Sequence, residues 1–549
     1  MLAKRAWLVL LLAVVAVYFY GLGSVPLLGP DEPRYAQVAR EMNARGDWVT
    51  PTLAGHTWFE KPALLYWLMM AGYSVFGVSE FAARFGSACA GVLTLLLIGW
   101  VGRRVELSAG ERMRPFGLTC AAVMASSAGL LVFSRGASFD IVLTATVTAS
   151  IACFFVSEIE RDVRRRRWLL AGFYASVGLS LLAKGLVGIV IPAGVVGLYF
   201  VLRRRLPNPL RLGIISGTLI CAAVAAVWYA PVITRHGHAF VDEFFVQQHF
   251  ARYVSNKYHH PQPFYFYVPI MALLALPWTV FLVGGLASLR ELNWRAEDAP
   301  SKLLVLTFAW LVVPVLFFSL SGSKLPGYVL PAVPGAALLA AERVLRYLRG
   351  GEGRLAMRLT GALAFALFGA GSFYVFHELR RAGDFPAFSP ADIAGAAAML
   401  VPAGVAGVIA FCCTRRRELC VVSITGATLL TVALVAACAF GRFARAESVG
   451  PLMREASTRG LGELKVFQLH TIERTAEFYA AGRIMYDEQG EPVKFEGGSQ
   501  AVEAVRAAGG RALVLVPPEY IHQLTDEPGV EASVVGDNGH AALVFVQTK

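Results

Sequence analysis

Residues 4–35 read KRAWLVLLLAVVAVYFYGLGSVPLLGPDEPRY, and this stretch decides the class of fold. A lysine–arginine pair precedes an apolar run over residues 6–20, and a polar segment with two carboxylates follows it. An apolar run with basic residues at one end is typical of a membrane-spanning helix whose basic end faces the cytoplasm. No A-x-A-like cleavage site follows, so we interpret the run as an uncleaved first span rather than as a signal peptide.

The composition of the whole chain supports this interpretation. Of the 549 residues, 56% are hydrophobic and 16% are charged, whereas soluble proteins carry about 25% charged residues. A soluble enzyme and a single-pass receptor are therefore excluded. The formal charge is +12, but the basic residues lie between apolar segments, so no nucleic-acid partner is expected. The eight cysteines lie in or beside apolar segments, which favours neither a disulfide framework nor a cysteine metal site.

The charge pattern predicts a topology. Apolar segments predict thirteen spans, centred near residues 14, 92, 124, 148, 176, 193, 221, 276, 312, 335, 366, 402 and 429. Arginine-rich connections alternate with connections that carry little arginine, and the positive-inside rule places the rich ones in the cytoplasm. They cover residues 4–5, 103–114, 161–167, 203–205, 290–302, 343–358 and 415–417. The same alternation places residues 21–80, 232–264 and all residues after about 441 outside the cytoplasm.

Two segments need separate interpretation. Pro62–Phe76 is apolar but only 15 residues long, which is short for a span, so we expect an interfacial or re-entrant helix. Residues 441–549 contain short β-rich runs and a helix-like segment, which predict a small α/β domain after a membrane domain at 1–440. The runs are 465–469, 512–516 and 541–546, and the helix is 500–508. No internal repeat is apparent, which disfavours a symmetric transporter.

The first outer loop carries the first candidate site. Asp31 and Glu32 precede Pro33, which is expected at the first helical position. A helix follows that has Tyr35, Val38, Ala39 and Met42 on one apolar face and ends at Gly46. An aspartate at a helix start is most often a cap. Its place beside Arg34 and Tyr35, at the outer edge of the first span, favours a functional group instead.

Other outer segments carry further acids and cations. These are Glu60 and Lys61 before the interfacial helix, Asp140 at the start of the fourth span, Lys184, His249, Arg252, and Lys324 with Tyr328. Taken singly, each has a structural explanation, such as a lysine that extends to the membrane surface. Taken together, cations on the outer face run against the positive-inside trend. They predict a site for anionic groups, and lipid-linked phosphates are the obvious ligands.

The motifs Asp31-Glu32-Pro33-Arg34-Tyr35, Phe59-Glu60-Lys61-Pro62, Phe139-Asp140, Lys184-Gly185 and Lys324-Leu325-Pro326-Gly327-Tyr328 occur in this order. The pattern resembles the GT-C polyprenyl-phosphate-sugar glycosyltransferases, in particular the lipid A aminoarabinose transferase family, which is related to protein O-mannosyltransferases. The resemblance implies an all-α polytopic membrane protein of about thirteen spans, with periplasmic juxtamembrane helices and a small C-terminal α/β domain. It also implies inverting transfer of 4-amino-4-deoxy-L-arabinose from undecaprenyl phosphate to lipid A.

The resemblance also assigns residues. Glu60 and His249 correspond to zinc-contacting positions, and Lys61, Arg252 and Tyr328 to donor-phosphate contacts. With the outer-face pattern, we expect catalysis by Asp31, Asp140 and Lys61. Substrate binding is expected at Arg34, Tyr35, Lys184, Arg252, Lys324 and Tyr328. The chain is expected to act as a monomer among the lipids of the bacterial inner membrane, with its N-terminus cytoplasmic and its C-terminus periplasmic.

Three alternatives stay open from the sequence. A protein O-mannosyltransferase-like enzyme would need Asp31 as a general base, because its acceptor is a hydroxyl. A transferase of a uronic acid onto lipopolysaccharide has similar chemistry. A lipid or sugar transporter would explain the many spans but would form no covalent product.

Overall fold

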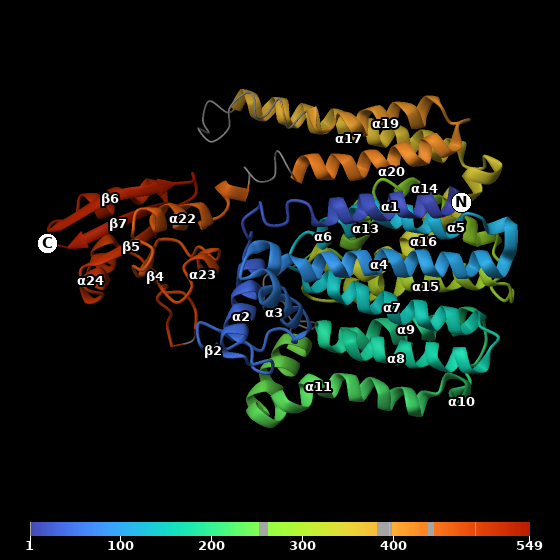
Figure 1. Cartoon of the computed structure of the whole chain (residues 1–549), viewed down its shortest axis with the longest axis horizontal. Helices are drawn as coiled ribbons and strands as arrows, with labels where there is room; N and C mark the ends of the chain where they lie inside the picture. Colours follow the sequence, from blue (N-terminus) through green and yellow to red (C-terminus); the bar gives the residue numbers. More distant parts are fainter. Residues whose placement is uncertain are drawn as a thin grey trace.

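The computed structural model describes residues 2–251, 262–381, 395, 398–436, 444–488 and 490–548. Helices form a bundle along the longest axis of the molecule (Figure 1), in which two successive pairs are bent by 57° and 116°. They are α1 (Leu2–Phe19), α4 (Glu80–Ala109), α5 (Phe116–Ala125), α6 (Ala128–Ser134), α7 (Phe139–Ile159), α8 (Val163–Lys184), α9 (Val187–Leu202), α11 (Ile214–Val241), α13 (Tyr267–Leu274), α14 (Thr279–Ser288), α15 (Ala299–Ser319), α16 (Val333–Gly350), α17 (Arg354–Arg381), α19 (Val401–Cys412) and α20 (Arg417–Leu434). The chain is a polytopic helical membrane protein.

The predicted spans coincide with these helices. Each of the thirteen centres falls in a helix, or for residue 276 at the break between α13 and α14. Within the described ranges, six helices are long and apolar enough to cross a membrane by themselves, and eight spans result if each of two bent pairs counts as one. α1, α9 and α19 have shorter apolar stretches, and α8 starts with four arginines. The number of thirteen crossings therefore stays a prediction.

The arginine-rich connections meet at one end of the bundle, as the alternation predicts. Arg104 pairs with Glu160 at 2.6 Å, and Arg203 pairs with Glu297 at 2.6 Å. Arg417 donates to the carbonyl of Arg349 at 2.8 Å. These contacts join connections that are far apart in the sequence. We call this end the arginine-rich end.

The opposite end is covered by α2 (Asp31–Arg45), by a small hairpin of β1 (Thr52–Leu53) and β2 (His56–Thr57), and by α3 (Leu64–Phe76). The predicted apolar face of α2 is buried. The helix ends at Gly46, which has a φ of 64° that suits glycine. The predicted start was wrong by two residues, because α2 begins at Asp31 and Pro33 lies inside its first turn. Proline is tolerated there because first-turn amides have no partner within the helix.

The C-terminal residues form a five-stranded sheet in the order β4-β3-β5-β7-β6. The strands are β3 (Val466–Leu469), β4 (Lys494–Phe495), β5 (Arg511–Val516), β6 (Val530–Asp537) and β7 (Ala542–Thr548). The helices around the sheet are α22 (Gly450–Thr458), α23 (Ala476–Tyr479), α24 (Gly498–Ala507) and α25 (His522–Thr525). Two separate apolar clusters form its core. The three predicted strands and the helix are therefore confirmed, whereas β4 and β6 were missed.

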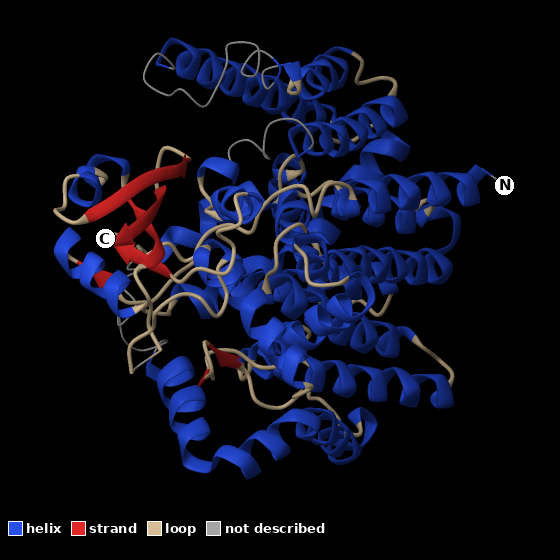
Figure 2. Cartoon of the chain, turned by 60° about the vertical axis from the view of Figure 1, so that its left-hand side comes forward, coloured by secondary structure: helices blue, strands red, loops and turns tan. Residues whose placement is uncertain are grey.

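The sheet lies beyond α2 and α3, on the side away from the bundle (Figures 1 and 2). Direct contacts join α23, one of the helices around the sheet, to α2: the Arg40 guanidinium donates to the carbonyl of Phe478 at 2.9 Å and lies 5.0 Å from the centre of its ring. The end of the bundle that carries the juxtamembrane helices is therefore covered by the C-terminal part of the chain.

Candidate active site

A cavity of about 430 Å³ opens at the covered end of the bundle. Its walls come from the loop before α2, from α2, from the turn before α7, from the end of α8 and from the segment before α16. The polar and aromatic side chains that line it are Asp31, Glu32, Tyr35, Lys61, Arg84, Phe133, Arg135, Ser138, Phe139, Asp140, Lys184 and Tyr328. The structure thus brings together six of the predicted site residues: Asp31, Tyr35, Lys61, Asp140, Lys184 and Tyr328.

Asp31 stands at the first position of α2 and keeps 53% of its side chain exposed. No side-chain cap bonds the start of this helix. The carboxylate instead accepts a hydrogen bond from Arg34 at 2.9 Å. Arg34 also donates to the carbonyl of Pro30 at 2.8 Å and lies 5.4 Å from the ring centre of Trp58. Arg34 is therefore beside the cavity as the partner of Asp31 and is not among the residues that line it.

Asp140, Lys184 and Tyr328 form one group from three elements. Asp140 lies in the first turn of α7, whose cap is the hydroxyl of Ser138. Lys184, the last residue of α8, donates to the Asp140 carboxylate. The same ammonium lies 4.4 Å from the ring centre of Tyr328. The lysine thus contacts an acid and an aromatic face while it lines the cavity.

A second, smaller cavity of about 90 Å³ adjoins the first. Glu60 and Gln248 line it, and it shares Lys61, Lys184 and Tyr328 with the larger cavity. Lys61 pairs with Glu60 at 2.6 Å, and both side chains are mostly buried. Two ammonium groups and one phenol therefore lie where the two cavities meet, which suits a phosphate whose sugar is on one side and whose lipid is on the other.

Among the described residues, the predicted Lys324 lies outside this arrangement. Lys324 is buried and donates to the carbonyl of Ser321 at 2.7 Å, so it does not line either cavity. His249 falls in a π-helix over Asp242–Ala251, but its side chain lies outside the described part of the structure, and Arg252 lies outside the described residues altogether. Tyr35 lies in the cavity wall as a buried ring whose edge faces Phe139, with ring centres 4.9 Å apart.

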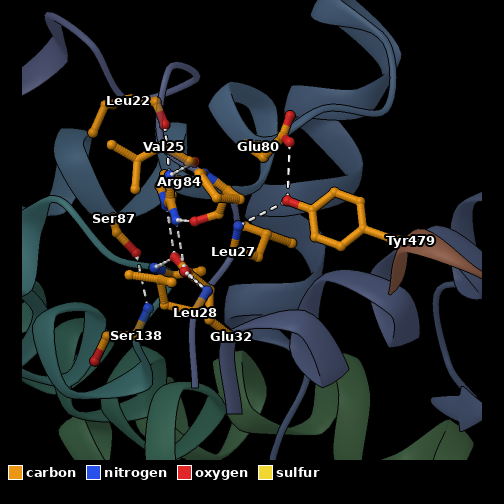
Figure 3. Close-up of polar contacts among 12 residues, drawn as sticks. Leu22, Val25, Leu27, Leu28, Glu32, Glu80, Arg84, Ser87, Ser138 and Tyr479 are labelled. Atoms are coloured by element: carbon orange, nitrogen blue, oxygen red, sulfur yellow. Dashed lines mark hydrogen bonds and ion pairs between the residues drawn. The ribbon is translucent and has the colours of Figure 1, made fainter. Parts of the chain in front are cut away.

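Arg84 is the main residue that the sequence interpretation missed. It lies on α4, is 3% exposed, and forms two hydrogen bonds of 2.7 Å with the carboxylate of Glu32. It also donates to three carbonyls of the loop before α2 (Figure 3). These carbonyls belong to Leu22, Val25 and Pro26, at 2.7, 2.6 and 2.9 Å. The signal available in the sequence was the position of Arg84 inside an apolar span, at the membrane edge where Glu32 is also expected.

Glu32 connects the parts of the cavity wall. Its carboxylate accepts from the amides of Leu28 and Ala137, at 3.0 and 2.8 Å, in addition to Arg84. Burial by itself raises the pKa of Glu32, but the charge of Arg84 and these hydrogen bonds outweigh burial and hold the pKa below its usual value. Glu32 therefore stays ionised. It holds the first turn of α2, where Asp31 also lies, against both α4 and the turn before α7.

Comparisons with known proteins identify the family of the chain. Residues 5–293 match the family model described as dolichyl-phosphate-mannose-protein mannosyltransferase. An undecaprenyl phosphate-alpha-4-amino-4-deoxy-L-arabinose arabinosyl transferase from Aeromonas salmonicida is 32% identical over 400 residues, which are 72% of this chain and 70% of the relative. The chain belongs to the aminoarabinose transferase family. A relative of the same name from Edwardsiella ictaluri is 33% identical over 361 residues, which are 64% of this chain and 62% of that relative.

Solved structures show the same fold. The structure is similar to ArnT from Cupriavidus metallidurans bound to undecaprenyl phosphate, with a TM-score of 0.77, 22% identity and 98% of each chain covered. The apo state of that protein gives a TM-score of 0.75 and 22% identity, with 99% of this chain and 98% of that chain covered. The similarity of fold therefore extends over 98% of this chain.

The family resemblance predicts zinc at Glu60 and His249. Among the described residues, no three His, Cys, Asp or Glu side chains come together as a metal-binding group. Glu60, the first predicted ligand, pairs with Lys61, and the side chain of His249 is not described. The described residues alone therefore do not make up a zinc site.

Proposed function

We propose that this chain is an inverting glycosyltransferase that moves 4-amino-4-deoxy-L-arabinose from undecaprenyl phosphate to a phosphate of lipid A. The proposal places the reaction at the periplasmic face of the inner membrane, in a protein of thirteen spans with a cytoplasmic N-terminus and a periplasmic C-terminus. The names of the relatives support the donor and the sugar. The observation that carries the proposal is the meeting of Lys61, Lys184 and Tyr328 with Asp31 and Asp140 in adjoining cavities.

The charges suggest how the reaction proceeds. A phosphate oxygen of the acceptor attacks the anomeric carbon of the sugar, the bond from that carbon to the donor oxygen breaks, and its electron pair goes to the leaving undecaprenyl phosphate. Negative charge grows on the leaving phosphate during this step. In the proposal, Lys61 and Lys184 stabilise this charge and the Tyr328 hydroxyl donates a hydrogen bond to it. The proposed leaving-group site is the junction of the two cavities.

The acids have a different part in the proposal. A lipid A phosphate is already an anionic nucleophile, so it needs no strong general base. Asp31 lies half exposed at the mouth of the larger cavity, where it orients the acceptor or the sugar and stabilises positive charge that develops on the sugar ring. Asp140 holds the Lys184 ammonium in place through their ion pair.

A second candidate is transfer to a protein hydroxyl, because the matching family model is described as a protein mannosyltransferase. In that reaction the acceptor carries a proton that must leave. Asp31 would then be the general base. The lipid A proposal is preferred because relatives that align over more of the chain bear the aminoarabinose name.

The deciding experiment uses the purified full-length chain with undecaprenyl phosphate-linked aminoarabinose and lipid A. Mass spectrometry is expected to find lipid A heavier by one aminoarabinose residue. A parallel reaction offers membrane proteins as acceptors, and another offers a uronic acid donor. Sugar on proteins alone would favour the second candidate, product from the uronic acid donor alone would identify a different sugar, and no covalent product with any donor would favour a transporter.

The zinc site stays a proposal of its own. Glu60 and His249 would supply two ligands, and water or a substrate phosphate would complete the site. Metal analysis of the purified protein beside its His249→Ala variant is the test. The proposal requires the variant to lose zinc, and equal zinc content in both proteins would remove the site.

A further inference from the structure

A groove of about 350 Å³ lies at the arginine-rich end, far from the active site. It runs between the first half of α8, the short helix α10 (Pro209–Leu212) and the start of α11. In Figure 1 these elements form the lower right corner of the bundle. The aminoarabinose transferase chemistry makes no use of this groove.

The charge in the groove is of one sign. Arg166, Arg167 and Arg211 line it, and none of its lining residues is an acid. Arg166 donates to the main-chain carbonyl of Arg211 at 2.6 Å, while its Nε is buried without a hydrogen-bond partner. The side chains of Arg167 and Arg211 form no ion pair within the part of the chain that the structure describes. Arg166 and Arg211 also border a neighbouring cavity, which is lined by the acids Glu158, Glu160, Glu297 and Asp298.

Other arginines at the same end are used differently. Arg104 pairs with Glu160, and Arg203 pairs with Glu297. Both pairs neutralise a guanidinium inside the protein. Three guanidinium groups that line one groove without an acid repel each other, and an anion between them would remove this repulsion. The groove is therefore suited to an anionic ligand.

The remaining walls are apolar. Leu170 and Tyr174 of α8 and Ile220 of α11 line the groove. The outer surface of α11 continues this apolar wall, with Ile215 at 79% and Leu219 at 66% exposure. An arginine-lined mouth that continues into an exposed apolar helix surface matches a molecule with one phosphate and long acyl chains. Free phosphate would use only the mouth.

We propose that the groove between α8 and α10–α11 binds one anionic phospholipid. The lipid phosphate contacts Arg166, Arg167 and Arg211, and an acyl chain lies along Leu170 and Ile220. Basic pockets between membrane helices are known to bind anionic lipid head groups in this way. This proposal does not depend on the transferase reaction.

The test is lipid binding to the full-length protein, delipidated in detergent. The probes are phosphatidylglycerol and phosphatidylcholine with the same acyl chains, and native mass spectrometry counts the bound lipids. The wild-type protein is expected to retain one phosphatidylglycerol that phosphatidylcholine does not replace. The variant Arg167→Gln/Arg211→Gln is expected to bind that lipid at least tenfold more weakly.

The matched control is Arg415→Gln/Arg416→Gln. It removes two exposed arginines from the same end but outside the groove. Its lipid retention should stay within about twofold of wild type, because interactions of exposed charges contribute little free energy. Equal retention in both double variants would overturn the proposal, as would equal retention of the two lipids. If Arg167→Gln/Arg211→Gln fails to fold, Arg167→Gln alone replaces it, because Arg167 is exposed. Displacement of the lipid by inorganic phosphate at equal concentration would assign the site to free phosphate and also overturn the proposal.

Discussion

Glu32 and Arg84 form a buried pair with two matched contacts, Nε to Oε1 and Nη2 to Oε2, each at 2.7 Å. The pair joins the first turn of α2 to α4 across a loop whose carbonyls Arg84 also binds (Figure 3). Asp31, the half-exposed catalytic candidate, is next to Glu32 in the sequence. Its position therefore depends on the buried Glu32–Arg84 pair. We expect this pair to determine both stability and the geometry of the larger cavity.

Arg84→Lys should lower the free energy of unfolding by about 3 kcal/mol, the cost of breaking a buried pair. A lysine ammonium cannot make the two parallel contacts with Glu32 and also reach three loop carbonyls. The melting temperature in detergent measures the loss. Arg103→Lys on the same helix is the control, because Arg103 is 45% exposed in its pair with Glu106 and should change stability by less than about 1 kcal/mol. Equal melting temperatures for the two variants would show that the Arg84 contacts contribute little.

Glu32 should also make stability depend on pH. Its pKa in the folded protein is held below the usual value by Arg84 and by amide hydrogen bonds that outweigh burial. The stabilisation is therefore complete above the ordinary glutamate pKa of about 4.3 and is lost as the pH falls through the lowered pKa. Melting temperatures measured from neutral pH downward should fall more steeply for wild type than for Glu32→Gln below about pH 4. Parallel curves would contradict a depressed pKa at Glu32.

Much of the fold could be predicted from the sequence because its signals are local. Apolar segments of helical length predicted most of the bundle helices, although α6 was not predicted and α13 with α14 was predicted as one span. The alternation of arginine predicted that the arginine-rich connections lie at one end of the bundle. The apolar face of α2, with Tyr35 and Met42 buried, followed from helical spacing. The edge strand β6 was missed because its side chains are mostly exposed and lack an apolar pattern.

The site could be predicted less completely, since it depends on contacts between distant segments. Motif residues such as Asp140 and Lys184 could be named individually, but their ion pair joins the start of one helix to the end of the next. Arg84 lies in an apolar helix and its partner Glu32 is 52 residues away. Lys324 looked equivalent to the other outer lysines, yet the loop carbonyl of Ser321 binds it away from the cavities.

Tyr479 connects the C-terminal part of the chain to the same loop. Its hydroxyl accepts from the buried amide of Leu27 at 2.8 Å and donates to Glu80 at 2.9 Å (Figure 3). Tyr479→Phe should lower the free energy of unfolding by about 1 to 3 kcal/mol, because the Leu27 amide loses its partner, and should also lower turnover. Thermal melts and kcat measure these effects. Tyr520→Phe is the control in the same sheet region, and equal losses in both variants would contradict a role for the Tyr479 hydroxyl.

Asp31→Asn should leave the fold intact but lower kcat about 100-fold, as removal of one electrostatic contact to the transition state typically does. Asp31 does not cap α2, and an asparagine oxygen can still accept from Arg34. Turnover of purified enzyme with the lipid-linked donor measures the effect. Asp526→Asn, in the C-terminal part, is the control and should keep full activity. Activity of Asp31→Asn within a few-fold of wild type would leave Asp31 with only a structural part.

Lys61→Ala should lower kcat more than it raises KM. Lys61 pairs with Glu60 at 2.6 Å and borders both cavities together with Lys184 and Tyr328, which is where the donor phosphate is proposed to lie. Charge on that phosphate grows as its bond to the sugar breaks, so the lysine acts more strongly on the transition state than on the bound donor. Loss of one such donor typically lowers kcat by about 100-fold to 1,000-fold, or about 3 to 4 kcal/mol.

Lys61→Arg separates a charge effect from a packing effect at the same position. The arginine keeps the positive charge and should recover part of the turnover that Lys61→Ala loses. If the lysine only anchors α3, the two variants should instead show the same turnover. Elution and melting behaviour must first show that each variant is folded. A folded Lys61→Ala enzyme with wild-type turnover would mean that the lysine serves only as the partner of Glu60, and the leaving phosphate would then have to rely on Lys184 and Tyr328.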